Sequence, residues 1–397
     1  MSAPDFTLKK AGNNHYVLPG HDEMKQDVHL YLNETLVDQL EYDSLRQLKN
    51  ASTLPGVEYI ACMPDVHVGY GVPVGGVMAM NAETGLVSAG AVGMDINCGM
   101  RLLMSNISAR ECSDDDIKSL ARKITRRIPL GIGTKSHHAD TLEPHINKIL
   151  RNGVPELVEL GFAKPEDCER IQDGGSYPGA DTSGITDDAW GRLDQLSTLG
   201  GGNHFIEIVR VNEIFDPEHA EAFGLSPDQL GVMIHTGSRG LGHQLCVDYS
   251  DTMLELAPKH DLSFPDDALA AAPIQSDIGQ DYLGAMGCAA NFAYCNRQVM
   301  THDIRKIFQE QFPKRGSKNN VNIIYDITHN LARFETVNEK DVLVHRKGAV
   351  RTLPPGHPDN PPAYDDTGHP VIIPGHMGIG SYVLSAGTNI EETYYSV

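Results

Sequence analysis

The chain has 397 residues, of which 40% are hydrophobic and 21% charged, a composition typical of a globular protein with a large buried core. Its formal net charge of −21 argues against nucleic-acid binding by bulk electrostatic attraction, because proteins that bind in that way are normally basic. No apolar run reaches the roughly 18 residues of a membrane helix, so we expect no membrane partner.

The N-terminus and the cysteines predict the compartment. The first residues, MSAPDFTLKK, lack the apolar segment of a secretory signal, so we expect a cytoplasmic protein. The seven cysteines are scattered and never form a C-x-x-C pair, which argues against a disulfide framework and against a zinc knuckle.

The predicted elements mix strands and helices along the whole chain. In chain order we expect an irregular lead-in (1–26), an edge strand (27–32), a helix (34–50), a strand (57–62), a loop (64–76), a strand (77–80), a capped helix (113–128), a helical stretch with a break at Gly161 (143–170), a strand (230–235), a helix (280–311) and three short strands (321–327, 342–345, 371–373). Apolar residues on nearly all sides of 280–311 indicate a central buried helix. No linker divides the chain, so the pattern favours a single α+β domain over residues 1–397.

The stretch AVGMDINCGMR, residues 91–101, carries the first chemical signal. Asp95 lies three residues before Cys98, in a predicted core region between Gly93 and Gly99. A carboxylate and a thiol buried together are costly unless they are paired or bind a cation. By itself D-x-x-C is a weak signal, and a structural cysteine with a capping aspartate explains it as well.

Four histidines follow apolar stretches at the points where strands should end, namely His204, His235, His329 and His345. Each of them alone is better explained as a satisfied core or loop residue. Several such imidazoles together with Asp95 and Cys98 suit Mn²⁺, Zn²⁺ or Fe²⁺ better than Mg²⁺, which prefers oxygen ligands. Because a thiolate can bridge two metals, the set could serve a two-metal site for phosphoryl chemistry.

The chain resembles a known family. The segments PDVHVGYGVPVGGV, AVGMDINCGMR, LGGGNHFIEI, IHTGSRGLGHQ, VHRKGA and PGHMGIGSYV, in this order, resemble the RtcB family of RNA-splicing ligases over about residues 57–384. The resemblance implies the family's own α+β fold, with mixed strands and helices packed around a central metal pocket. It also implies a GTP- and Mn²⁺-dependent ligase that joins RNA 2′,3′-cyclic phosphate or 3′-phosphate ends to 5′-hydroxyl ends, in tRNA splicing and RNA repair.

The resemblance assigns roles residue by residue. The ligands of two Mn²⁺ ions, with Cys98 bridging, would be Asp95, Cys98, His204, His235 and His329. Nucleotide-binding positions would be Asn203, Glu207, His376 and Ser381, and positions near the phosphates would be Arg239 and Asn330. RNA and GTP are the implied partners, and a requirement for an activating protein stays open.

Two departures from the family's pattern bear on catalysis. In the family the guanylylated histidine follows in a C-H-G-A-G-R motif, whereas this sequence ends at Val397 after SAGTNIEETYYSV. The C-terminal part of the family domain is therefore expected to be missing, and the catalytic nucleophile is unknown. The second departure is His376, which stands where the family usually has a small residue and is the nearest candidate nucleophile.

Two alternatives to the ligase remain open at this point. One is a truncated, catalytically inactive relative that binds metal and RNA ends, which the missing nucleophile favours. The other is a metal-dependent phosphohydrolase that opens cyclic phosphates without GTP. The physiological RNA, the metal loaded in the cell and the oligomeric state are not determined by the sequence.

Overall fold

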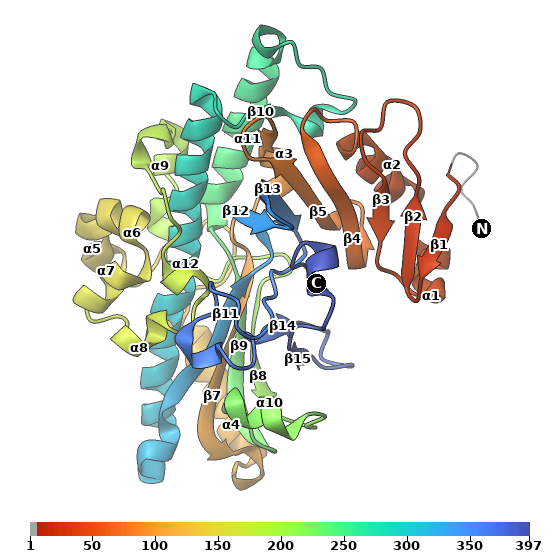
Figure 1. Cartoon of the computed structure of the whole chain (residues 1–397). Helices are drawn as coiled ribbons and strands as arrows, with labels where there is room; N and C mark the ends of the chain where they lie inside the picture. Colours follow the sequence, from red (N-terminus) through yellow and green to blue (C-terminus); the bar gives the residue numbers. More distant parts are fainter. Residues whose placement is uncertain (1–5) are drawn as a thin grey trace.

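Two larger β-sheets and one long helix organise the fold in a computed structural model that describes residues 6–397 (Figure 1). The larger sheet has the strand order β1-β2-β3-β4-β5-β13-β12, and the four-stranded sheet has the order β11-β7-β9-β8. Neighbouring strands run antiparallel throughout both sheets except for the parallel pair β3 and β4. The fold is therefore the mixed α+β type that the sequence predicted.

The strands have the following bounds. The larger sheet contains β1 (Lys9–Gly12), β2 (His15–Leu18), β3 (Val28–Leu30), β4 (Val57–His67), β5 (Val74–Asn81), β12 (Asn330–Val337) and β13 (Lys340–Lys347). The four-stranded sheet contains β7 (Gly99–Ser108), β8 (Phe205–Arg210), β9 (Gln229–Thr236) and β11 (Val321–Thr328). Two small pairs are β6 (Leu86–Ser88) with β10 (Ala271–Pro273), and β14 (Val371–Ile373) with β15 (Tyr382–Leu384).

The helices lie between and outside the sheets. Their bounds are α1 (Glu34–Gln39), α2 (Tyr42–Ala51), α3 (Ala89–Val92), α4 (Asp114–Arg127), α5 (Ala139–Leu142), α6 (Ile146–Asn152), α7 (Val154–Glu159), α8 (Pro165–Cys168), α9 (Asp187–Trp190), α10 (Pro217–Ala222), α11 (Arg239–Leu256) and α12 (Asp277–Gln311).

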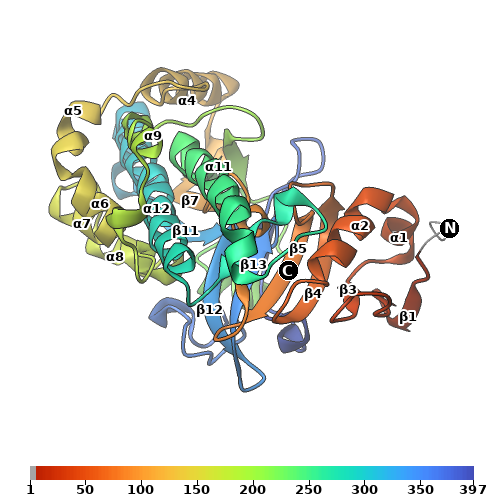
Figure 2. The same cartoon turned by 90° about the horizontal axis from the view of Figure 1, so that it is seen from above.

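Helix α12 is the central element, as its apolar pattern predicted. It begins where the Ser276 side chain accepts a hydrogen bond from the Gly279 N–H, and it is buried on nearly all sides. Helices α4, α6, α7 and α11 pack around it, and it also contacts β9 and β11. Figure 2 shows α11 and α12 side by side over the strands, with α5 to α8 beyond α12. One large hydrophobic cluster, which runs from Phe6 to Leu343, joins these helices to both sheets, and two smaller clusters contain other strand residues of the same sheets.

The expected irregular lead-in over residues 1–26 is wrong for its described part. Residues 9–12 and 15–18 form β1 and β2, which add two antiparallel strands to the edge of the larger sheet. The strands are short, and β1 is exposed along its whole length, so they lack the apolar alternation that marks a strand in a sequence. Strands β1 and β2 form because they pair along the edge of the sheet, and not because of a local sequence pattern. Residues 1–5 lie outside the described part.

Other boundaries moved for identifiable reasons. Because β2 pairs with β3, the strand expected over 27–32 is interior and not an edge. The helix expected over 34–50 is two helices, since Leu40 takes an extended conformation between α1 and α2. Strand β4 continues through Pro64 to His67, and Pro64 lies in an exposed, irregular part of the pairing with β5. The stretch 143–170 is interrupted at the expected Gly161, which has a positive φ after α7, and also at Gly153, which has a positive φ between α6 and α7.

Candidate metal centre

The five predicted metal ligands lie at one end of the four-stranded sheet. Strand β7 begins just after Cys98, β9 ends just after His235, and β11 ends just before His329. Register fixes this arrangement, because Gly99 pairs with Thr328 on one side and with Thr236 on the other. Adjacent antiparallel strands alternate in direction, so the start of β7 and the ends of its two neighbours meet at the same end of the sheet. His204 reaches this end of the sheet from the start of β8, where Phe205 pairs with His235.

The ligand atoms form two groups that share one thiol. Asp95, Cys98 and His204 make one group, and Cys98, His235 and His329 make the other, with the ligand atoms of each group within 4.8 Å of one another. The Cys98 Sγ lies 3.4 Å from His204 Nε2 and 3.3 Å from His235 Nε2. His204 Nε2 is 2.7 Å from an Asp95 carboxylate oxygen, and the Nε2 atoms of His235 and His329 are 3.3 Å apart.

The chemistry of this donor set fits metal ions. Nδ1 of His235 lies 3.0 Å from the Asn203 carbonyl oxygen, and Nδ1 of His204 lies 3.2 Å from that of Leu199. An imidazole whose Nδ1–H donates to a carbonyl presents the lone pair of Nε2, which is the usual outer support of a metal-binding histidine. A thiol, a carboxylate and three imidazoles suit a borderline transition metal better than Mg²⁺.

Burial sets the protonation of these groups. It raises the pKa of the Cys98 thiol well above its ordinary value, and the nearby Asp95 carboxylate raises it further. Burial and the neighbouring His204 lower the pKa of His235 to about 4, and burial with His235 lowers the pKa of His329 well below its ordinary value. Burial is the largest single influence on Asp95 and would raise its pKa, but the hydrogen bonds to His204 and Cys98 and the charges of His204 and Arg239 together outweigh it, and the pKa is lowered. Metal binding must therefore displace a proton from Cys98, whereas the two imidazoles are already neutral.

The residues expected near the phosphates flank the metal ligands. Arg239 begins α11 with a φ of 57°, and its Nη1 lies 2.8 Å from His204 Nδ1. The buried Nε of Arg239 has no hydrogen-bond partner among residues 6–397. Asn330 donates from its side-chain amide to the Asp95 carbonyl at 3.2 Å and accepts from the Gly348 N–H at 2.9 Å. Asn330 thus shapes the turn that carries Asp95, and a phosphate contact by Asn330 stays a prediction.

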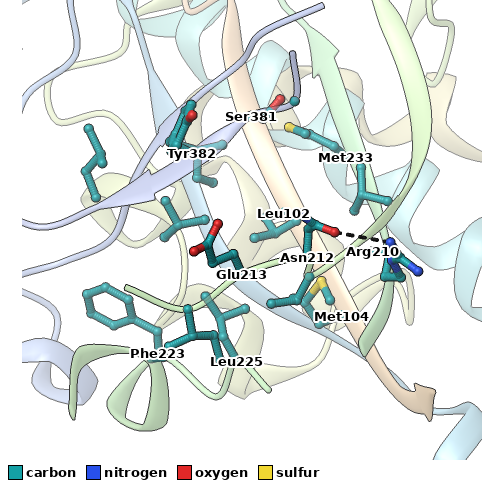
Figure 3. A pocket seen from close by; sticks show the side chains of 18 of the residues that line it. Leu102, Met104, Arg210, Asn212, Glu213, Phe223, Leu225, Met233, Ser381 and Tyr382 are labelled. Atoms are coloured by element: carbon teal, nitrogen blue, oxygen red, sulfur yellow. Dashed lines mark hydrogen bonds between the residues drawn. The ribbon is translucent and has the colours of Figure 1, made fainter. Parts of the chain in front are cut away.

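The four residues expected to bind the nucleotide divide into two groups. Glu207 and Ser381 line a cavity of about 770 Å³ between β8 and the β14–β15 hairpin. Figure 3 shows Ser381 and Tyr382 on one side of this cavity and Glu213 on the other. Asn203 and His376 are exposed and lie outside the cavity lining. His376 Nδ1 accepts a hydrogen bond from the Gly378 N–H at 3.0 Å, and its role as nucleophile stays a prediction.

His345, the fourth histidine at a strand end, does not belong to the metal groups. Its Nε2 accepts from the Ser88 N–H at 3.2 Å, and its Nδ1 lies 3.3 Å from the Met78 carbonyl oxygen. It is a buried and satisfied core residue. Sequence reasoning missed instead the buried Arg297, which pairs with Asp326 behind the candidate metal centre. The signal was present, since an arginine inside an all-round apolar helix requires a buried partner.

Comparisons with known proteins agree with this arrangement. A family model described as tRNA-splicing ligase RtcB matches residues 47–397. The tRNA-splicing ligase RtcB of Methanococcus maripaludis is 43% identical over 400 residues, which cover 98% of this chain and 83% of that protein. The protein of the same description from Thermococcus kodakarensis is 40% identical over 98% of this chain and 82% of its own length. The RNA-splicing ligase RtcB of Mycobacterium tuberculosis is 41% identical over 88% of this chain and 81% of its own length.

Among residues 6–397, none of the helices combines the length and the apolar character needed to cross a bilayer.

Proposed function

Because the chain belongs to the RtcB family of tRNA-splicing ligases, we propose that it is an RNA ligase that uses GTP and Mn²⁺. It joins an RNA 2′,3′-cyclic phosphate or 3′-phosphate end to a 5′-hydroxyl end. One structural observation carries the proposal beyond the family relationship. Cys98 belongs to both ligand groups, which is the arrangement that a pair of metal ions bridged by one thiolate requires.

The five ligands would hold the two ions at one end of the four-stranded sheet. Asp95, Cys98 and His204 would hold one ion, and Cys98, His235 and His329 the other. A pair of bound Mn²⁺ ions supplies charge neutralisation for phosphoryl groups and polarises their oxygens. The Asn203 carbonyl orients the ring of His235 before an ion arrives, whereas the Leu199 carbonyl would accept from the Nδ1–H of His204 once an ion occupies Nε2.

Arg239 supports phosphate binding beside these ligands. Its guanidinium lies next to His204, and its buried Nε–H lacks a partner within residues 6–397. A buried donor without an acceptor costs about 1–3 kcal/mol, and a phosphate oxygen would satisfy it. Arg239 is therefore placed to bind the phosphate of the RNA end or of the nucleotide.

The cavity lined by Glu207 and Ser381 is the proposed site for the guanosine part of GTP. Its volume of about 770 Å³ is ample for a nucleoside, and apolar side chains such as Leu102, Met104 and Met233 line it (Figure 3). A carboxylate such as Glu207 can accept hydrogen bonds from the N1–H and the amino group of guanine, whereas adenine lacks this pair of donors. This difference supports GTP over ATP as the nucleotide.

Ligation of defined RNA ends tests the proposal. The protein is incubated with Mn²⁺, labelled GTP and two RNAs, one with a 2′,3′-cyclic phosphate end and one with a 5′-hydroxyl end. We expect a joined RNA that depends on both Mn²⁺ and GTP, and label on the protein in a denaturing gel. Loss of that label in His376→Ala, with Mn²⁺ binding unchanged, is the result expected if His376 is the nucleophile.

The same assay separates the alternatives. A phosphohydrolase would open the cyclic phosphate without GTP and would form no joined product. An inactive relative would bind Mn²⁺ and RNA ends and would neither open nor join them. The family and its relatives favour the ligase over both alternatives.

A further inference from the structure

Arg297 lies behind the metal centre, on the central helix α12, and its side chain is 0% exposed. A charged group in such a place is costly unless opposite charge and hydrogen bonds compensate for lost hydration. Its partner Asp326, on β11, is equally buried and accepts from Nε at 2.8 Å and from Nη2 at 2.8 Å. This two-point contact fixes the plane of the guanidinium.

The remaining donors of Arg297 reach two other segments. Nη1 donates to the Asn97 carbonyl at 2.9 Å and to the Thr236 carbonyl at 2.8 Å. Nη2 also donates to the Asn97 side-chain oxygen at 3.0 Å. A guanidinium has five N–H donors, and these five hydrogen bonds use all of them.

Each acceptor lies next to a metal ligand in the chain. Asn97 immediately precedes Cys98, and Thr236 immediately follows His235. Asp326 lies three residues before His329, near the end of β11. One rigid side chain therefore ties together the three segments that carry Cys98, His235 and His329, the members of one ligand group.

The other ligand group has different supports. The Asp95 carbonyl is held by Asn330, and the ring of His204 contacts Leu199 and Arg239. Of the five Arg297 hydrogen bonds, only those to Asn97 affect this group, because Asn97 is adjacent to Cys98 and Cys98 belongs to both groups. The two halves of the centre thus depend on Arg297 to different degrees.

We propose that Arg297 is a positioning residue that assembles the Cys98–His235–His329 half of the metal centre. The inference rests on the two-ion centre proposed above. Arg297 touches neither ion nor substrate, and it acts by fixing the spacing of three ligand-bearing backbones. A lysine at this position keeps the charge opposite Asp326 but lacks the planar fork, so it cannot hold Asn97, Thr236 and Asp326 together.

Arg101 provides a matched control. Its side chain is also 0% exposed, and it donates to the same Asp326 at 2.6 Å. Its other hydrogen bonds go to Gln298 and Thr301, both on α12, and not to Asn97 or Thr236. Arg101→Lys therefore makes the same chemical change at an equally buried position beside the same carboxylate. It leaves the hydrogen bonds of Arg297 to Asn97, Thr236 and Asp326 in place.

The experiment compares Mn²⁺ binding by the wild type, Arg297→Lys and Arg101→Lys. Equilibrium binding measures the number of ions per chain, and electron paramagnetic resonance distinguishes a coupled pair of ions from isolated ones. We expect two coupled ions in the wild type and in Arg101→Lys. We expect about one ion, with the spectrum of an isolated Mn²⁺, in Arg297→Lys. If Arg297 merely stabilised the core, both variants would unfold at a changed temperature, and both would still bind two ions.

Several results would overturn the inference. Two coupled ions in Arg297→Lys would show that the planar guanidinium is not needed. Equal losses of bound Mn²⁺ in Arg297→Lys and Arg101→Lys would show a general effect of core disruption. A wild type that binds no Mn²⁺ would contradict the two-ion centre itself, and with it the proposed function. If Arg297→Lys does not fold, Asn97→Gly decides, because glycine readily adopts the φ of 52° at this position. The change removes the side-chain acceptor of Arg297 together with a donor to the Ala290 carbonyl, and it keeps the Asn97 backbone carbonyl that Arg297 also contacts. We expect at least tenfold weaker binding of one ion in that variant. Unchanged binding would contradict the positioning role of Arg297.

Discussion

Arg239 holds its Nη1 2.8 Å from the Nδ1 of His204, whose Nε2 faces the Asp95 carboxylate. A guanidinium can only donate, so in this arrangement Nδ1 accepts and Nε2 carries the ring proton. A metal ion at Nε2 needs the other tautomer, in which Nδ1–H donates to the Leu199 carbonyl. An ion held at Nε2 would therefore free the guanidinium of Arg239 from His204 and make it available to an anion.

Arg239→Gln is predicted to separate metal binding from catalysis. Removal of a cation and of a competing donor beside His204 should leave Mn²⁺ affinity unchanged or increase it. Loss of one charged donor at a reacting phosphate should slow ligation roughly 10²- to 10³-fold. Mn²⁺ titration and the RNA-joining assay measure the two effects, with Arg122→Gln on the exposed face of α4 as a control. Parallel loss of Mn²⁺ binding and ligation would contradict the prediction.

Cys98→Ala is predicted to abolish binding of both ions. The thiolate belongs to both ligand groups, so its removal leaves two ligands in each group, too few to hold an ion tightly. Metal analysis after dialysis against Mn²⁺ measures the result, and we expect less than about one-tenth of the wild-type content. The control is Cys288→Ala, which removes another buried thiol on α12, outside both groups. Retention of even one ion in Cys98→Ala would mean that the thiolate does not bridge.

Glu207→Gln is predicted to weaken GTP binding and to reduce discrimination against ATP. The amide keeps the shape of the side chain but loses the negative charge, and it can accept only one of the two guanine donors. The expected loss of GTP affinity is about tenfold or more, because hydrogen bonds to a charged group contribute roughly 1.5–3 kcal/mol. Glu213→Gln is the matched control, since Glu213 lines the same cavity at another position (Figure 3). Competition binding with GTP and ATP measures both quantities, and equal effects of the two variants would remove Glu207 from the nucleotide site.

His345→Gln is predicted to change how stability depends on pH. Burial lowers the pKa of His345 from 6.5 to about 4, so the folded protein keeps this ring neutral where the unfolded chain binds a proton. The wild type therefore loses free energy of unfolding through His345 as the pH falls from about 6.5 to about 4, by up to about 3 kcal/mol. Glutamine does not titrate, so the stability difference between wild type and variant should shrink over this interval.

Denaturant unfolding of metal-free protein at pH 7, 6, 5 and 4.5 measures this difference. A chelator removes metal ions, and the titration of His235 and His329 is common to both proteins and cancels. A stability difference that stays constant over this range would show that His345 has an ordinary pKa in the folded protein.

Several features could be predicted because their cause is local. The capping box of Ser113 and Asp116 marked the start of α4, and the all-round apolar pattern of 280–311 marked α12 as a buried helix. The five candidate metal ligands were also proposed from the sequence, through residue types in distinctive motifs, and the structure brings these residues together. Residue chemistry decides what a side chain can bind, and that information is present in the chain itself.

The tertiary structure alone decided how these residues combine. The division of the ligands into two groups follows from the register of β7 between β9 and β11, which no local pattern specifies. The hydrogen bonds of Arg297 join segments separated by up to 200 residues, and strands β1 and β2 form only by pairing with the sheet edge. The exclusion of His345 from the centre has the same origin, since only packing against β5 and Ser88 satisfies its ring. Distances between segments far apart in the chain depend on strand pairing and core packing, and these are properties of the whole fold.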